Sequence, residues 1–298
     1  MGEKTTKRPE LKIRRASFEM HWFKSQISAL EIQQKGNQIK TVFRGELISS
    51  RTVSTMYGLF DFRLFAETII PFIENEFHPT LYDMTISAGI QEIVLYGESV
   101  MINNELYYKT LAVFNSTNAQ HALLMTCGLF RQVCENGMSI SAGTNEFQIR
   151  SKHSYKAIPK ITELFYERLS LINSSYIRQI EYIKSLENKE MSAYTCFRSL
   201  THDTNGNQLA TMVEVCIRLS KYLLTSKTDK IKKEDYSENQ LKSLKHPVKF
   251  LERDPDCEDL QLPLITIYNC YTELFKNRNS AIKEKENIRI AEVLAKHV

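Results

Sequence analysis

The chain has 298 residues, of which 42% are hydrophobic and 25% charged, a composition typical of a globular protein that buries a core. No apolar stretch reaches the ~18 residues that a membrane-spanning helix needs, and residues 1–15 lack the apolar core of a signal peptide. These features argue against a membrane protein, and we expect a protein that stays in the cytoplasm without a membrane partner.

The formal net charge of +4 is concentrated at the N-terminus. Residues 1–15 hold six basic and two acidic side chains, whereas the rest of the chain holds 33 of each. We expect a flexible basic arm over residues 1–16, which can neutralise phosphates and therefore favours nucleic acid as a partner. The alternative is a solvated tail that only aids solubility.

The first quarter of the chain mixes helix and strand signals. Apolar residues recur at near-helical spacing over residues 17–35, which predicts a helix. β-Branched residues and alternation predict a strand over 39–53. Asp61 is the expected N-cap of a second helix, which the apolar repeat extends to about Phe77 despite Pro71.

The next segment is rich in Val, Ile, Tyr and Thr and is broken by glycines and paired asparagines, which predicts an antiparallel meander. A helix over about 119–135 is expected to cross this sheet, because Leu123, Phe130 and Cys134 would then lie on neighbouring turns. The predicted strands cover residues 81–88, 92–95, 106–114, 138–142 and 147–150.

From residue 158 onward the apolar pattern is helical, over about 158–186, 189–201, 207–226 and 263–286, with a lysine-rich loop at 227–249. The predicted class is α+β: an antiparallel β-meander crossed by a helix, followed by a mainly helical C-terminal half. The predicted organisation is the basic arm, an α+β domain over 17–157, and a helical region over 158–298 packed on it.

The sequence contains no complete catalytic or cofactor signature. It has no glycine-rich phosphate loop and no dinucleotide fingerprint. Cys134 could form a thiol–imidazole pair with His121 or His153, but the end of the predicted helix disfavours a thiolate there. The acidic run 254–259 lacks the glycine and glutamate of a calcium loop, and the six cysteines are expected to be free thiols. We therefore expect no enzyme activity, no metal site and no cofactor.

One region carries a more specific pattern. A strand-like segment ends in Asn-Ser, and a later segment reads Arg-Gln-Val-Cys-Glu-Asn. Together they resemble the core signature of the phage/plasmid-like protein family, domain of unknown function 932, in which a strand ends in Asn-Ser-His-Asp-Gly-Ser and the following helix ends in Arg-x-Val-Cys-x-Asn. The chain has Thr117-Asn118 in place of His-Asp, so no role of that pair is carried over.

Two further pieces agree with this resemblance. Residues 150–153 look like the family's basic-His step, and residues 268–273 look like its Tyr-Asn-x-x-Thr-Glu helix. The resemblance therefore spans roughly residues 40–275. The family-motif residues of this chain are Asn115, Ser116, Arg131, Cys134, Asn136 and His153.

The resemblance implies a protein of phages or conjugative plasmids, made in the cytoplasm of a bacterial host. By analogy of fold, a meander packed against a helix is also similar to the single-strand annealing proteins of phages. We expect a non-enzymatic homo-oligomer that binds single-stranded nucleic acid and assists its annealing, recombination or protection. The alternative is a protein-interaction factor with a host or phage protein as partner, such as a phage-encoded inhibitor of host defence or a particle-associated structural protein.

Under the first hypothesis basic side chains contact phosphates, and exposed members of Tyr57, Phe60, Tyr107 and Tyr108 stack on bases. The alternative for these aromatic residues is an ordinary place in the core, and Arg131 could equally hold a carboxylate within the fold. The predicted nucleic-acid-binding residues are Lys7, Arg8, Lys12, Arg14, Arg15, Arg44, Arg51, Lys109, Arg131, Arg150 and Lys152.

Overall fold

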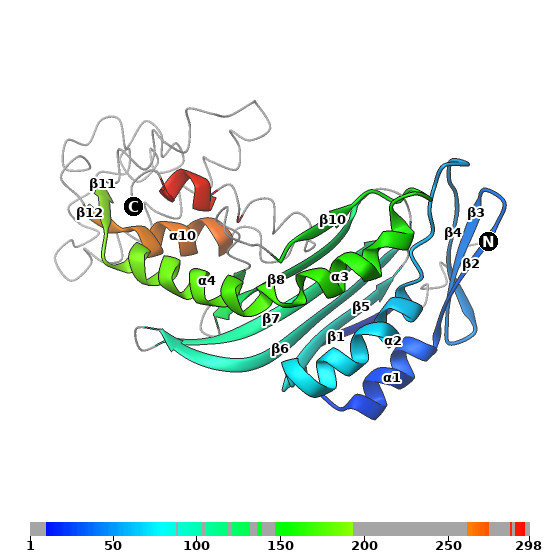
Figure 1. Ribbon diagram of the computed structural model, residues 1–298, viewed down its shortest axis with the longest axis horizontal. Helices are drawn as coiled ribbons and strands as arrows, with labels where there is room; N and C mark the ends of the chain where they lie inside the picture. The colour runs from blue at the N-terminus through cyan, green and yellow to red at the C-terminus, as the bar shows by residue number, and fades with distance from the viewer. Residues whose placement is uncertain are drawn as a thin grey trace, which may run out of the picture. The chain divides into compact units, whose positions relative to one another are not determined.

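The computed structural model describes residues 10–87, 89–102, 105–117, 121–131, 136–138, 147–192, 261–273, 287 and 290–295 (Figure 1). The chain divides into two compact units, one of residues 1–179 with 279–284 and one of residues 180–278 with 285–298. The first unit therefore extends past the predicted boundary at residue 157. Its helices and antiparallel sheets confirm the α+β class.

A large antiparallel sheet forms the centre of the first unit. Its middle is the predicted meander, in which β5 (Leu81–Ser87), β6 (Ile90–Ile102), β7 (Glu105–Ser116) and β8 (Leu123–Arg131) pair in chain order. β1 (Leu11–Ser17) pairs with β5 at one edge, and both β10 (Ile149–Ser151) and the short β9 (Asn136–Met138) pair with β8. The meander and the strand at 147–150 are thus confirmed.

The predicted helix over residues 119–135 is wrong, because Leu123–Arg131 is the strand β8. Residues 123–130 are buried without a break, so the side chains on both faces of this strand are shielded from solvent. A continuous apolar run has no period, so it does not distinguish a buried strand from a buried helix. Asn136 and Gly137, which directly follow the predicted helix, lie in β9. Of the predicted strand over 138–142, residues 139–142 lie outside the described residues.

The predicted basic arm is also wrong where the structure describes it, because Leu11–Ser17 is the edge strand β1. Leu11 and Ile13 pair with Ile86 and Met84 of β5 and supply an apolar face for the core. Lys12, Arg14 and Arg15 lie on this edge strand, where charge discourages pairing with other chains. Residues 1–9 lie outside the described residues.

The predicted helix over 17–35 is only partly correct. α1 covers Met20–Ser28, and β2 begins at Leu30. β2 (Leu30–Lys35), β3 (Gln38–Phe43) and β4 (Glu46–Thr52) form a separate three-stranded sheet, so the strand predicted over 39–53 is a hairpin. The hairpin turns at Arg44 and Gly45, whose φ angles of 52° and 77° lie in the left-handed region typical of tight hairpin turns.

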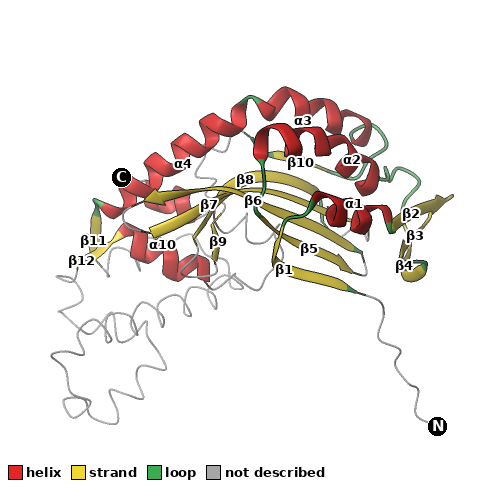
Figure 2. Ribbon diagram, turned by 90° about the horizontal axis from the view of Figure 1, so that it is seen from below, coloured by secondary structure: helices red, strands yellow, loops and turns green. Residues whose placement is uncertain are grey.

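The second predicted helix is confirmed. α2 (Phe62–Phe72) begins where the Leu64 N–H donates to Asp61 Oδ1 at 3.1 Å, and a π-helical turn, η1 (Ile73–Phe77), continues it past Pro71. Figure 2 shows α1, α2 and α3 (Ile161–Leu169) over one face of the large sheet. The core between them includes Phe165, whose ring lies edge-on to Phe65 at 5.4 Å between centroids.

The helical region after residue 158 is confirmed where it is described, in η2 (Ile158–Lys160), α3 and α4 (Leu171–Glu187). In the second unit β11 (Glu190–Ser192) pairs with β12 (Gln261–Pro263), so a strand begins where a helix over 189–201 was predicted. α10 (Leu264–Glu273) confirms the start of the last predicted helix. Residues 207–226 and 227–249 lie outside the described residues. None of the described helices is long and apolar enough to span a membrane.

Candidate nucleic-acid interface

Several predicted phosphate contacts are ion-paired within the fold. Arg131 lies on β8 and makes a bidentate pair with Glu105 of β7. Lys109 Nζ lies 2.6 Å from Glu98 Oε2 and above the ring of Tyr176. These contacts favour a structural role for both cations, and for Arg131 they support the alternative in which it holds an internal carboxylate.

The arginines of the edge strand are also engaged within the fold. Arg14 Nη1 donates to Asp83 Oδ2 at 3.2 Å, and the backbone N–H of Arg15 donates to Asp83 Oδ1 at 2.6 Å. Arg15 has a φ of 45°, and the register of β1 shifts at this point. Tyr96 adds a third donor to Asp83, so this buried carboxylate holds the bulge of β1 in place.

The remaining predicted cations differ in their surroundings. Arg44 donates to Gln26 Oε1 at 2.8 Å and lies over the ring of Phe43. Lys12, Arg51, Arg150 and Lys152 are exposed, while Lys7 and Arg8 lie outside the described residues. The nine described cations of the prediction thus do not share one environment, and they divide into paired and exposed groups.

The predicted base-stacking residues are mostly core. Tyr57, Phe60 and Tyr107 are buried, and Tyr108 is half-buried. For the three buried rings the ordinary core interpretation is therefore the correct one. The structure instead exposes Tyr155, which the sequence reasoning missed although it lies between Lys152 and Lys156.

Residues 150–160, here called the basic segment, concentrate exposed positive charge. Arg150, Lys152, Lys156 and Lys160 are all exposed, and the segment contains no Asp or Glu. Among the described residues none of the four pairs with a carboxylate. Tyr155 is 50% exposed, and Lys156 Nζ lies 5.8 Å from the centroid of its ring. The segment thus presents cations and an aromatic ring together.

The basic segment is anchored on residues 56–58. The rings of His153 and Tyr57 are stacked, with 5.1 Å between centroids and 3° between planes. The Gly58 N–H donates to the His153 carbonyl at 3.3 Å, and the Tyr155 N–H donates to the Met56 carbonyl at 3.4 Å. A Cβ at Gly58 would overlap the Ser154 backbone, so only glycine fits this close approach.

Tyr57 also brings two of the family-motif segments together. Its hydroxyl donates to the carbonyl of Ser116, the last residue of β7, at 3.1 Å. Its ring stacks on the ring of His153. Burial raises the pKa of Tyr57, so the hydroxyl stays protonated. Burial lowers the pKa of His153, partly offset by the Gly58 backbone, and neither buried ring nitrogen of His153 makes a hydrogen bond. His153 is therefore held as a neutral ring.

Asn115 is a structural residue of the motif. Its Nδ2 donates to Gln91 Oε1 at 2.8 Å, and Gln91 Nε2 donates to Thr117 Oγ1 at 3.4 Å. The Thr117 hydroxyl lies 3.2 Å from that of Thr41, on the small sheet. All four side chains are buried, so this chain of polar contacts ties the large sheet to the small one. Cys134 lies outside the described residues.

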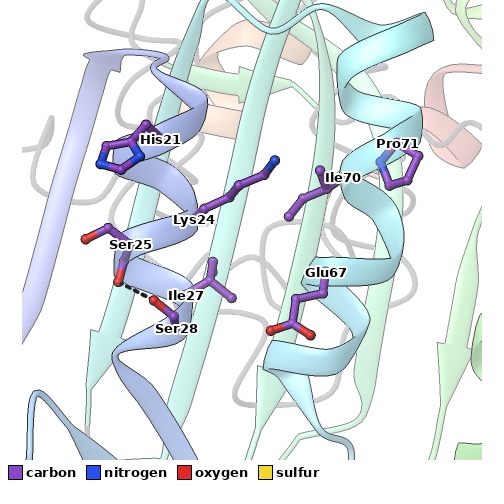
Figure 3. Close-up of a pocket in the computed structure, with 8 residues that line it drawn as sticks. All are labelled: His21, Lys24, Ser25, Ile27, Ser28, Glu67, Ile70 and Pro71. Atoms are coloured by element: carbon purple, nitrogen blue, oxygen red, sulfur yellow. Dashed lines mark hydrogen bonds between the residues drawn. The ribbon is translucent and has the colours of Figure 1, made fainter.

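Other parts of the described chain are weaker candidates for a binding site. A pocket of about 600 Å³ lies between α1 and α2, with Lys24 extending into it and Ile27 and Ile70 among its lining residues (Figure 3). Lys24 pairs with Glu74 at 3.0 Å, so the pocket has no isolated charge at that position. The residues that the structure describes contain no group of three His, Cys, Asp or Glu arranged to hold a metal ion. Among these features the basic segment is the best candidate site.

Comparison with known proteins identifies the family. No curated protein and no solved structure matches the chain. The model of the family described as Domain of unknown function (DUF932) matches residues 95–246, just over half of the chain. The matched range includes β7, β8 and the basic segment, and the chain belongs to the DUF932 family.

Proposed function

We propose that the chain is a non-enzymatic protein that binds single-stranded nucleic acid through the basic segment, residues 150–160. The observation that carries this proposal is the set of four exposed cations in a segment that has no acidic residue and that also exposes the ring of Tyr155. Nonspecific binding of single strands relies on this combination, because cations neutralise phosphates and aromatic rings stack on unpaired bases.

The anchoring of the segment supports binding in a second way. The Tyr57–His153 stack and the backbone hydrogen bonds of Gly58 and Tyr155 fix the conformation of the segment before a ligand arrives. A contact surface that is already ordered loses less conformational entropy when it binds. The wider role that we propose is to assist the annealing, recombination or protection of single strands of phage or plasmid DNA.

The first test is a salt series with a labelled single-stranded oligonucleotide. The double variant Lys152→Met/Lys156→Met should flatten the plot of log affinity against log salt by about 0.7 for each phosphate that the variant no longer neutralises. Lys40→Met is the matched control, because Lys40 is exposed on the small sheet, away from the basic segment in sequence. The control should keep the slope of the unmodified protein.

The second test addresses stacking. Tyr155→Ala should weaken binding to single strands by about 1–3 kcal/mol, the range measured for one base on one aromatic ring, and should change binding to duplex much less. Tyr166→Ala is the matched control, because Tyr166 is 49% exposed on α3, next to acidic Glu167. Equal reductions in the two variants, or no binding of single strands by the intact protein at ~50 mM salt, would reject the proposal. The second outcome would favour the protein-interaction alternative.

A further inference from the structure

We propose that His153 is a proton-sensitive anchor, which holds the basic segment in place when the ring is neutral and releases it when the ring is protonated. The release concerns the conformation of the chain and can be measured without a ligand. Its effect on nucleic-acid affinity rests on the function proposed above. Under this proposal His153 and Tyr57 are positioning residues for the contacts made by their neighbours in the segment.

The contacts between the basic segment and residues 56–58 depend on the position of the His153 ring. His153 directly precedes two residues that contact segment 56–58. The Ser154 backbone packs closely against Gly58, and the Tyr155 N–H donates a hydrogen bond to the Met56 carbonyl. The His153 side chain stacks on the ring of Tyr57. Tyr57 is itself fixed by its hydrogen bond to the Ser116 carbonyl of β7. Displacing the His153 ring therefore removes the support beneath the exposed cations.

Protonation disfavours this position for a specific reason. An imidazolium carries two N–H donors, whereas neither buried ring nitrogen of His153 makes a well-formed hydrogen bond and the Gly58 backbone offsets the cost of burial only in part. The groups that the described residues place against the ring include the side chain of Tyr57 and the backbone of Gly58, and neither supplies a carboxylate. Tyr57 stays neutral, so it cannot balance the charge. A cation over the tyrosine face gains some attraction, but that contact leaves both N–H groups unsatisfied.

The sign of the effect follows from the lowered pKa of His153. The released ring, with an ordinary pKa of about 6.5, takes up a proton more readily than the anchored ring. The anchored conformation is therefore fully favoured above about pH 6.5 and loses stability as the pH falls from there towards the lowered pKa. One proton changes the equilibrium by up to about tenfold per pH unit within this window.

This behaviour is opposite to that of an ordinary cationic surface. Acidification charges histidines, and added positive charge strengthens phosphate binding. Release of the basic segment should instead weaken the binding of single strands below about pH 6.5. A simple electrostatic response and the proposed anchor thus predict opposite slopes of affinity against pH.

The experiment measures hydrogen exchange of the full chain by mass spectrometry, on peptides that cover residues 56–60 and 153–158, between pH 5.5 and 7.5. Rates are corrected for the intrinsic pH dependence of exchange. Protection should fall by up to about fivefold from pH 6.5 to pH 5.5, because the released ring is already half protonated at pH 6.5 and exchange reports the open population. His153→Phe keeps an aromatic ring against Tyr57 but has no proton to gain, so its protection should stay constant.

The outcomes separate the two proposals. Protection that is constant with pH in the unmodified protein, or that falls equally in His153→Phe, overturns the anchor. If His153→Phe does not fold, an NMR titration of His153 decides instead: a pKa at or above the ordinary value overturns the anchor. Protection that falls with acid while single strands bind at no pH supports the anchor and rejects the proposed function. Binding that strengthens on acidification, with constant protection, rejects the anchor alone.

Discussion

The ion pair between Arg131 and Glu105 separates structural cations from candidate contacts. Replacing Arg131 by Met removes a guanidinium that makes two hydrogen bonds to Glu105, and keeps most of the apolar stem. The Glu105 carboxylate would then retain the hydroxyl of Tyr107 as a donor, at 3.2 Å. We expect the variant to lose stability and to keep its affinity for single strands.

The magnitude follows from how deeply the pair is buried. The side chains of Arg131 and Glu105 are 13% and 27% exposed. Removing one partner of a fully buried pair costs about 3–5 kcal/mol, whereas a surface pair contributes about 0–1 kcal/mol. A value between these limits, about 1–3 kcal/mol, fits the partial exposure of both groups. At about 2–4 °C per kcal/mol, the melting temperature should fall by several degrees.

The assay is a double-mutant cycle. Thermal or urea unfolding is measured for Arg131→Met, Glu105→Gln and the combined variant, and the coupling free energy isolates the pair from the other contacts of each residue. Arg150→Met is the matched control, because Arg150 is exposed on β10 and pairs with no carboxylate of the described chain. It should change stability by less than about 0.5 kcal/mol and lower the affinity for single strands. A stable Arg131→Met variant that binds as weakly as Arg150→Met would refute this reasoning.

Three further predictions concern the anchors of the fold. Gly58→Ala should destabilise the protein by about 1–3 kcal/mol in thermal unfolding, because the new Cβ would overlap the Ser154 backbone; an unchanged melting temperature would contradict that close approach. Asp83→Asn should accelerate hydrogen exchange across β1, since the carboxylate accepts the Arg15 N–H; exchange equal to that of the unmodified protein would argue against this role. Cys127, whose thiol is buried, should react with alkylating agents only as fast as the protein unfolds, and rapid labelling of the folded chain would disagree with its burial.

The elements that the sequence predicted correctly are those set by local chemistry. The start of α2 depends on a capping carboxylate three residues before Leu64, and both partners are visible in one short stretch of sequence. The meander from β5 to β7 depends on turns between adjacent strands. β8 was missed because its buried run has no period, and β1 was missed because its basic residues concealed the alternation of Leu11 and Ile13.

The candidate site was harder to predict because strand register decides which charges are free. A shift in the pairing of β6 with β7, between Tyr96 and Ser99, places Glu98 beside Lys109. Nothing in the sequence near Lys109 distinguishes it from exposed Lys152. A count of basic residues therefore overestimates the phosphate-binding surface, since paired cations contribute little to it.

The position of the basic segment also depends on a contact between residues that are distant in the sequence. The basic-His motif indicated residues 150–153, but its support comes from Tyr57, almost a hundred residues earlier in the chain. Sequence reasoning assigned Tyr57 a direct role in stacking on bases, whereas the buried ring supports His153. The exposed ring suited to a base is Tyr155, two residues after His153. Since motif residues and contact residues alternate within this one segment, variants of His153 should change the pH dependence of binding, and variants of Tyr155 its strength.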